Sequence, residues 1–160
     1  MIRHHLLSLG TAALSVIGAG QSACAAEPPV NTLKNSSFFS SRTDTAINGY
    51  DTVAYFTVGK PVKGLDSFVA DWMGAKWKFA SQAHLDLFKA SPETYAPQYG
   101  GYCAYGVTQG YLVKVDPDQF TVRDGKLYLN YDADVQAKWS KNAAGYITDA
   151  NTTFPGLLKK

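Results

Sequence analysis

Two side chains near the middle of the chain, His84 and Cys103, could bind a metal ion together. They belong to an aromatic segment that runs from Trp77 to Tyr105. An imidazole nitrogen and a thiolate sulfur are ligands that zinc and copper both accept. After removal of an N-terminal export signal, described below, they are the only histidine and the only cysteine left. The sequence therefore predicts one candidate metal site.

The small number of ligands restricts the metal. A closed zinc site normally has four Cys or His ligands, so zinc would need carboxylates such as Asp51 to complete it. Copper(I) accepts fewer and softer ligands, and His84, Cys103 and Met73 form such a set. Two other interpretations stay open: His84 as a core histidine with satisfied ring nitrogens, and Cys103 as a buried, unreactive apolar residue.

Four tyrosines accompany these positions and are candidates for lining a pocket: Tyr50, Tyr99, Tyr102 and Tyr105. Tyrosines in this pattern also serve as core residues with polar tips. Asp51 is well placed to cap a short helix that begins after it, and Gly100-Gly101 indicates a tight bend. A catalytic Cys–His pair would need an orienting acid and a nucleophile motif, and the sequence shows neither.

The first of the elements that must position these residues is a hairpin over 68–79 that turns at Met73-Gly74. Its alternation places six residues on one face: Phe68, Ala70, Trp72, Ala75, Trp77 and Phe79. The other face pairs Asp71 with Lys76, so one face suits a core and the other suits water. A helix over 82–90 follows, with Ser81 as its N-cap, and a second short helix starts at Ser91-Pro92.

A second hairpin is predicted over 120–130, where Asp124-Gly125 suits a type I′ turn. This register pairs Phe120 with Leu129 and Val122 with Leu127. Asp132 then caps a helix that directs Val135 and Trp139 to the core. The last residues, with Gly145, Pro155 and Gly156, look less regular, and no internal repeat is evident. The predicted class is α+β, a small single domain with two β-hairpins packed against short helices.

The N-terminus has the pattern of an export signal over residues 1–26. Arg3 opens a short basic region, residues 6–20 are mostly apolar but too few to span a bilayer, and small residues lead to Ala26. We therefore expect a periplasmic or secreted protein without a membrane span in its mature form. A lipoprotein signal, acylated at Cys24, is the alternative. Residues 27–46 are expected to form a flexible arm ahead of the domain.

Composition limits the partners of the mature chain. Removing 26 of the 160 residues leaves 134, enough for one domain with a real core. Loss of Arg3 leaves 14 basic residues against 13 acidic ones, and they form no basic run, so we expect no nucleic-acid partner. With one remaining cysteine, the exported protein cannot form an internal disulfide, so its thiol needs burial, a metal or a partner.

The segment from Trp77 to Tyr95 resembles the YHS domain family. It reads Trp-Lys-Phe-Ala-Ser-x-x-His-x-x-x-Phe-x-x-x-Pro-x-x-Tyr. Three further segments are similar to the exported branch of that family: residues 49–56, 99–105 and 124–131. The resemblance covers about residues 47–157, and it implies a YHS-like domain over that range.

The resemblance also implies metal handling, because YHS domains occur beside heavy-metal transport ATPases and in other metal-related proteins. This sequence departs from the metal-binding version of the family at Ala80 and His84, which stand where two cysteines would be. The resemblance therefore leaves only a rebuilt site, with His84 and a cysteine from the later segment.

These observations lead to one functional hypothesis and two alternatives. The hypothesis is an exported metal-binding module, of copper type, that binds, delivers or senses the ion without turnover. Its partners would be the metal ion and a protein not identified by the sequence. The first alternative is a structural or protein-interaction module with a degenerate YHS site. The second is a cysteine-dependent redox enzyme.

Overall fold

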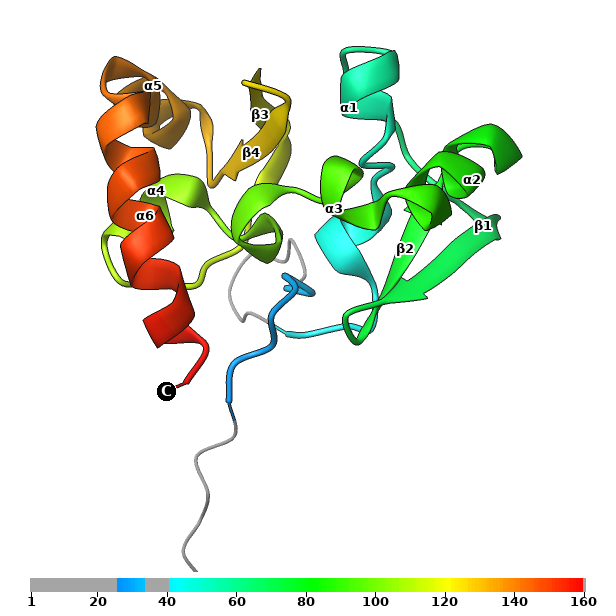
Figure 1. Ribbon diagram of the computed structural model, residues 1–160, viewed down its shortest axis with the longest axis horizontal. Helices are drawn as coiled ribbons and strands as arrows, with labels where there is room; N and C mark the ends of the chain where they lie inside the picture. The colour runs from blue at the N-terminus through cyan, green and yellow to red at the C-terminus, as the bar shows by residue number, and fades with distance from the viewer. Residues whose placement is uncertain (1–25, 34–40, 160) are drawn as a thin grey trace, which may run out of the picture.

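The computed structural model describes residues 26–33 and 41–159. The expected signal peptide therefore lies outside the described residues, apart from Ala26. Two antiparallel two-stranded sheets and a set of short helices make up the described part, which confirms the α+β prediction (Figure 1).

The first hairpin joins β1 (Leu65–Trp72) to β2 (Ala75–Phe79). Asp71 lies opposite Lys76, as predicted, and Val69 lies opposite Lys78. The two turn residues, Met73 and Gly74, have φ of 50° and 78°. Positive φ at both positions is the geometry of a type I′ turn, whose twist matches that of the strands it joins.

A helix packs its apolar side against this hairpin. α2 (Gln82–Ala90) begins after Ser81, whose hydroxyl accepts a hydrogen bond from the backbone N–H of His84 at 3.2 Å, so the predicted N-cap is confirmed. The ring of Phe88 stacks on that of Trp77 with centroids 5.2 Å apart, and both side chains are buried. The short helix α3 (Pro92–Tyr95) follows, with its proline in the first turn.

The second hairpin repeats this arrangement. β3 (Asp116–Arg123) pairs with β4 (Lys126–Asn130), with Phe120 opposite Leu129 and Val122 opposite Leu127, as predicted. α5 (Ala133–Lys141) begins after Asp132, whose carboxylate accepts from the N–H of Val135 at 2.8 Å. The two predictions of strand register and helix cap are therefore confirmed here as well.

The C-terminal residues are more regular than the sequence suggested, because they form α6 (Ala143–Leu157). Ala143, Ala150 and Leu157 are buried at a spacing of seven residues, which gives this helix one apolar stripe. The stripe packs against α4 (Ala104–Thr108), a short helix that was also not predicted. Pro155 lies only two residues before the end of α6, so the helical hydrogen bond that it cannot donate falls in the last turn.

The order of secondary-structure elements repeats, although no repeat is evident in the sequence. Two short 3-10 turns, η1 (Ala46–Gly49) and η2 (Gln98–Gly101), each open a series of six elements. η1 is followed by α1 (Ala54–Thr57), β1, β2, α2 and α3, and η2 by α4, β3, β4, α5 and α6. Figure 1 shows the two series side by side, in cyan to green and in yellow-green to red.

The two series also agree in their residue positions. Each paired strand residue of the second hairpin lies 51 residues after its counterpart, as in Val69 and Phe120 or Lys78 and Leu129. The N-caps Ser81 and Asp132 have the same spacing. Each 3-10 turn contains three consecutive residues with positive φ. In both turns the third of these residues is a glycine, and a tyrosine follows it. The chain is thus built from two copies of one structural unit.

Residues 30–33 of the predicted flexible arm are buried in the core, so the prediction of a flexible arm needs correction there. Val30, Asn31 and Leu33 are at most 7% exposed. Asn31 donates its backbone N–H to the carbonyl of Gly100 and its side-chain amide to that of Gly101, both at 2.9 Å.

Glycine makes this close approach possible. A Cβ built at Gly100 would lie 1.8 Å from the carbonyl oxygen of Pro29. The N-terminal segment therefore lies against η2 only because Gly100 has no side chain. In Figure 1 this segment, in blue, runs up between the two halves.

Of the helices that the structure describes, none combines the length and apolar character needed to cross a bilayer.

Candidate functional site

Two of the predicted site residues, Asp51 and His84, lie in direct contact. Asp51 precedes α1, and His84 is in the first turn of α2. The Oδ2 atom of Asp51 is 2.6 Å from the Nδ1 atom of His84. This pair joins two elements that are 33 residues apart in sequence.

The carboxylate of Asp51 is fully buried and fully hydrogen-bonded. Its Oδ1 atom accepts from the backbone N–H groups of Val53 at 2.9 Å and Ala54 at 3.2 Å, which confirms the predicted helix cap. Its Oδ2 atom also accepts from the N–H of Ala80, at 2.8 Å. Backbone N–H groups that converge on a carboxylate stabilise its charge without a neighbouring cation. Asp51 therefore binds the start of α1, the end of β2 and the ring of His84.

The ring of His84 is held from one side and approachable from the other. Because Asp51 accepts at Oδ2, His84 donates from Nδ1, which leaves the lone pair of the neutral ring on Nε2. Nε2 lies 3.2 Å from the hydroxyl oxygen of Thr57, an exposed residue at the end of α1. The side chain of His84 is 17% exposed. The chain thus presents one oriented imidazole nitrogen near its surface.

Cys103 lies in a core cluster to which both halves contribute, among them Phe79 and Leu129. Its side chain is 1% exposed, and its sulfur accepts from the N–H of Gly106 at 3.3 Å and lies 3.7 Å from the amide oxygen of Asn130. Among the described residues, its sulfur has hydrogen-bond contacts with Gly106 and Asn130, and it has none with the ring of His84. The structure therefore does not bring Cys103 to His84.

Cys103 is instead the counterpart of Asp51 in the second structural unit. Each residue follows a 3-10 turn and a tyrosine, and each accepts a hydrogen bond from the N–H three residues later. Their own N–H groups donate to equivalent carbonyls, of Val62 and Val113. The position that corresponds to His84, 51 residues later, is Val135. The second unit therefore has a thiol in place of the carboxylate and no imidazole.

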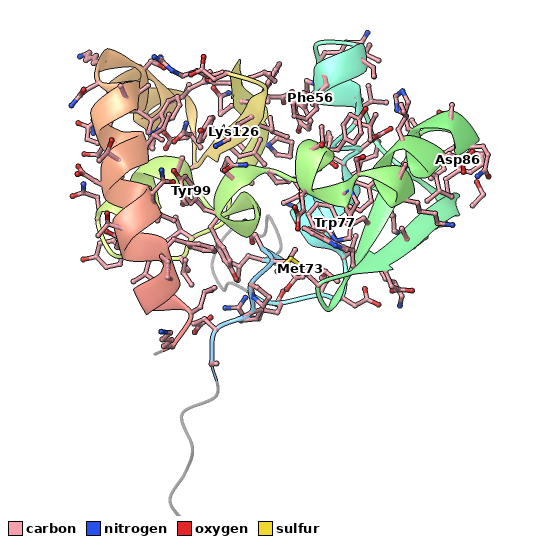
Figure 2. All side chains as sticks on the ribbon, viewed as in Figure 1. Phe56, Met73, Trp77, Asp86, Tyr99 and Lys126 are labelled. Atoms are coloured by element: carbon pink, nitrogen blue, oxygen red, sulfur yellow. The ribbon has the colours of Figure 1, made fainter. Side chains whose placement is uncertain are left out.

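Met73 is also remote from the pair. It occupies the turn between β1 and β2 and is 51% exposed. In Figure 2 it lies at the lower end of the hairpin, whereas Asp86 marks α2 at the upper right. The methionine of the predicted copper set therefore does not meet His84 in this structure.

The four tyrosines do not line one pocket. Tyr50 lies under the ammonium group of Lys63, and Tyr105 meets the ring of Tyr146 edge to face. Tyr99 donates its hydroxyl to the side chain of Asn151 at 3.1 Å, and Tyr102 donates its own to the carbonyl of Pro28 at 3.1 Å. Burial raises the pKa of the Tyr99 and Tyr102 hydroxyls. These side chains connect helices and the N-terminal segment, as core tyrosines with polar tips do.

Within residues 26–33 and 41–159, no group of three or more His, Cys, Asp or Glu side chains is arranged to hold a metal ion. The donor set around His84 is the Nε2 atom and the hydroxyl of Thr57, which form a hydrogen bond of 3.2 Å with each other, with the carboxylate of Asp51 behind the ring. This set suits an open site that takes further ligands from outside the chain, and it does not form a closed zinc site.

Comparison with known protein families, with curated proteins and with solved structures gives no match. The resemblance to the YHS family therefore stays a prediction.

Burial determines the reactivity expected of Cys103. Burial raises the pKa of its thiol, and the N–H groups of Gly106, Tyr131 and Tyr105 offset this effect only in part. The folded protein therefore keeps the proton above the ordinary pKa of a thiol, and folding stability should fall as the pH rises through that value.

We expect iodoacetamide to label Cys103 slowly at neutral pH and rapidly once urea unfolds the chain. Rapid labelling of the folded protein would contradict this, and would support a redox role.

Proposed function

We propose that this protein is an exported binding module, without turnover, that holds a metal ion of copper type at the Nε2 atom of His84. Delivery or sensing of the ion in a periplasm-like compartment would be its role. The observation that carries the proposal is the 2.6 Å contact between Nδ1 of His84 and the buried carboxylate of Asp51.

A carboxylate behind an imidazole is the usual support of a metal-binding histidine. Metal-bound histidines typically donate their second ring N–H to a carboxylate, which fixes the ring and makes the ligating nitrogen more basic. Asp51 is itself fixed by the N–H groups of Val53, Ala54 and Ala80. Imidazole nitrogens suit copper as well as zinc. The orientation and the tautomer of the His84 ring are therefore those that metal binding at Nε2 would require.

The proposed site is open, and this suits transfer better than storage. The chain contributes Nε2 and, next to it, the hydroxyl of Thr57. Water or the protein that gives or receives the ion would supply the remaining ligands. Because Cys103 and Met73 lie elsewhere, the proposal replaces the predicted His–Cys–Met set with a single histidine ligand.

A second candidate function follows from the burial of Asp51. The carboxylate is 0% exposed and joins α1, β2 and α2. These contacts favour a structural role in a protein-interaction module. In that case the ring of His84 only donates one more hydrogen bond to the buried carboxylate of Asp51, which then acts as a structural clamp. The two functions differ in whether Nε2 has a ligand.

Metal titration of the purified protein distinguishes the two. We expect one equivalent of copper, offered as copper(I) and as copper(II), to bind the wild type and to be lost in His84→Ala. Asp51→Asn should reduce the affinity by about 10- to 100-fold, because an amide carries no charge and has only one accepting oxygen, whereas Asp51 accepts at both. Cys103→Ser and Met73→Leu are the matched controls and should bind as the wild type does.

The outcomes are decisive if circular dichroism shows that each variant is folded. Uptake that is unchanged in His84→Ala would overturn the proposed site, and uptake lost only in Cys103→Ser would restore the predicted thiolate ligand. Tighter binding of zinc than of copper, with the same dependence on His84, would keep the site and correct the metal. No binding by any variant would favour the structural clamp.

A further inference from the structure

A hollow of about 310 Å³ lies beside η1, on the first half of the molecule. The ammonium-bearing side chains of Lys63 and Lys78 line it, together with the polar side chains of Thr43 and Thr45. Its size is at the lower end of the range found for small-molecule sites. Two lysines in one hollow are a favourable environment for an anion.

The charge of Lys63 is not neutralised by an acid. Its ammonium group donates to the carbonyl oxygen of Asn48 at 2.6 Å and lies 4.2 Å from the centre of the Tyr50 ring. Among the described residues, no carboxylate forms an ion pair with it. Burial, and then the charge of Lys78, lower the pKa of Lys63. Two positive charges therefore repel each other across the hollow.

The nearby acids leave the hollow positive. Lys78 pairs with Asp66 at 2.5 Å, but the side chain of Asp66 is 89% exposed, and such surface pairs contribute little. Asp44 also lines the hollow, and its carboxylate binds Lys76 at 2.6 Å. An incoming anion would thus meet the ammonium group of Lys63, which has no carboxylate partner among the described residues, and that of Lys78, whose partner is solvent-exposed.

The second structural unit shows that the fold does not require this hollow. The counterpart of Lys78 is Leu129, which is fully buried in the core. Over η2, the region corresponding to the hollow is covered by Pro29, Val30 and Asn31, which pack on Gly100. The same unit can therefore close this region with apolar side chains and a peptide segment. In the first unit the region stays open, and Lys78 stands at the position of Leu129.

We propose that this hollow binds an oxyanion, the carboxylate or phosphate group of a small ligand, between Lys63 and Lys78. Hydrogen bonds from ammonium groups to such oxygens are charge-assisted and are among the stronger ones in proteins. The hydroxyls of Thr43 and Thr45 also lie on the wall, where they donate to the carbonyl of Thr32 and to the carboxylate of Asp44. This site shares no residue with the Asp51–His84 pair, so it stands or falls independently of the proposed metal function.

Titration of the purified protein with inorganic phosphate and with citrate, at constant ionic strength, tests the proposal. Backbone amide chemical shifts around η1 and the turn before β1 should move with at least one of the two anions. Lys63→Gln and Lys78→Gln should each weaken binding by about 10- to 100-fold, as expected for the loss of a hydrogen bond to a charged group. Lys114→Gln is the matched control, because Lys114 is the counterpart of Lys63 in the second unit and lies over the ring of Tyr131.

Each outcome supports or overturns the proposal. Phosphate binding alone assigns a phosphoryl ligand, and citrate binding alone assigns a carboxylate ligand. Recovery of binding in Lys63→Arg would show that the charge, and not the packing of the lysine, is required. Absence of binding for both anions at millimolar concentration would overturn the site. An equal loss in Lys114→Gln would also overturn it, since that result indicates attraction to the net charge only.

Discussion

Replacing Asp51 by alanine is expected to lower the free energy of unfolding by about 3–5 kcal/mol, because it leaves several buried hydrogen-bond donors without an acceptor, each at a cost of about 1–3 kcal/mol. The variant leaves the N–H groups of Val53, Ala54 and Ala80 without their acceptor and the ring of His84 without its support. Because small domains have a total stability of about 5–15 kcal/mol, this change should bring the protein close to unfolding at room temperature. Urea denaturation followed by tryptophan fluorescence measures it.

The counterpart position in the second unit provides the control. Cys103→Ala removes a weaker acceptor from the same place in the fold, and we expect a cost of about 1 kcal/mol, in the range of one net hydrogen bond. A loss below 1 kcal/mol for Asp51→Ala would contradict the buried network. Equal losses for the two variants would show that the charge of Asp51 contributes nothing beyond the cap.

Local signals in the sequence were sufficient for the hairpins and most helix starts. A two-residue turn such as Asp124-Gly125 determines which strand residues face each other, so one turn fixes a whole register. Ser81 and Asp132 cap helices through bonds to residues only three positions away. These predictions succeed because every group involved is a near neighbour in sequence.

Contacts between residues that are far apart in the sequence could not be predicted from such local signals. Asp51 and His84 were each recognised as candidates, but the sequence grouped His84 with Cys103 because both are metal ligands. Which of these side chains meet depends on how α2 packs against the start of α1, and nothing in the local pattern encodes that. The burial of the N-terminal segment was missed for the same reason, since its partners, Gly100 and Gly101, lie about 70 residues away.

The repeat is not evident in the sequence because equivalent positions of the two units share structural roles more than residue types. Trp77 and Tyr128 occupy one core position of the β-hairpins, and Phe88 and Trp139 one core position of the helices that follow. Each pair keeps an aromatic core residue but changes its identity. The polar positions diverge further, from Asp51 to Cys103 and from His84 to Val135. The two units therefore share a scaffold, and only the first carries the carboxylate–imidazole pair.

The N-terminal segment should be essential for stability, although its composition is that of a loop. A chain that begins at residue 41 loses two buried side chains, Val30 and Leu33, which belong to two different clusters of buried side chains. Burial of an aliphatic side chain contributes about 1.5–3 kcal/mol, so we expect a loss of about 3–6 kcal/mol relative to a chain that begins at residue 27. The hydrogen bonds of Asn31 to Gly100 and Gly101 are lost as well.

A pair of matched point variants separates packing from chain length. Val30→Ala should lower the free energy of unfolding by about 1–3 kcal/mol, whereas Val58→Ala should change it by about 0.5 kcal/mol or less. The reason is burial: Val30 is 1% exposed and Val58 is 50% exposed. Urea denaturation of the two truncated chains and the two variants gives all four values. Equal stability of the chains that begin at residues 27 and 41 would show that the segment is the flexible arm its sequence suggests. A loss in both the shorter chain and Val30→Ala would make it a structural part of the domain, which then begins near residue 27.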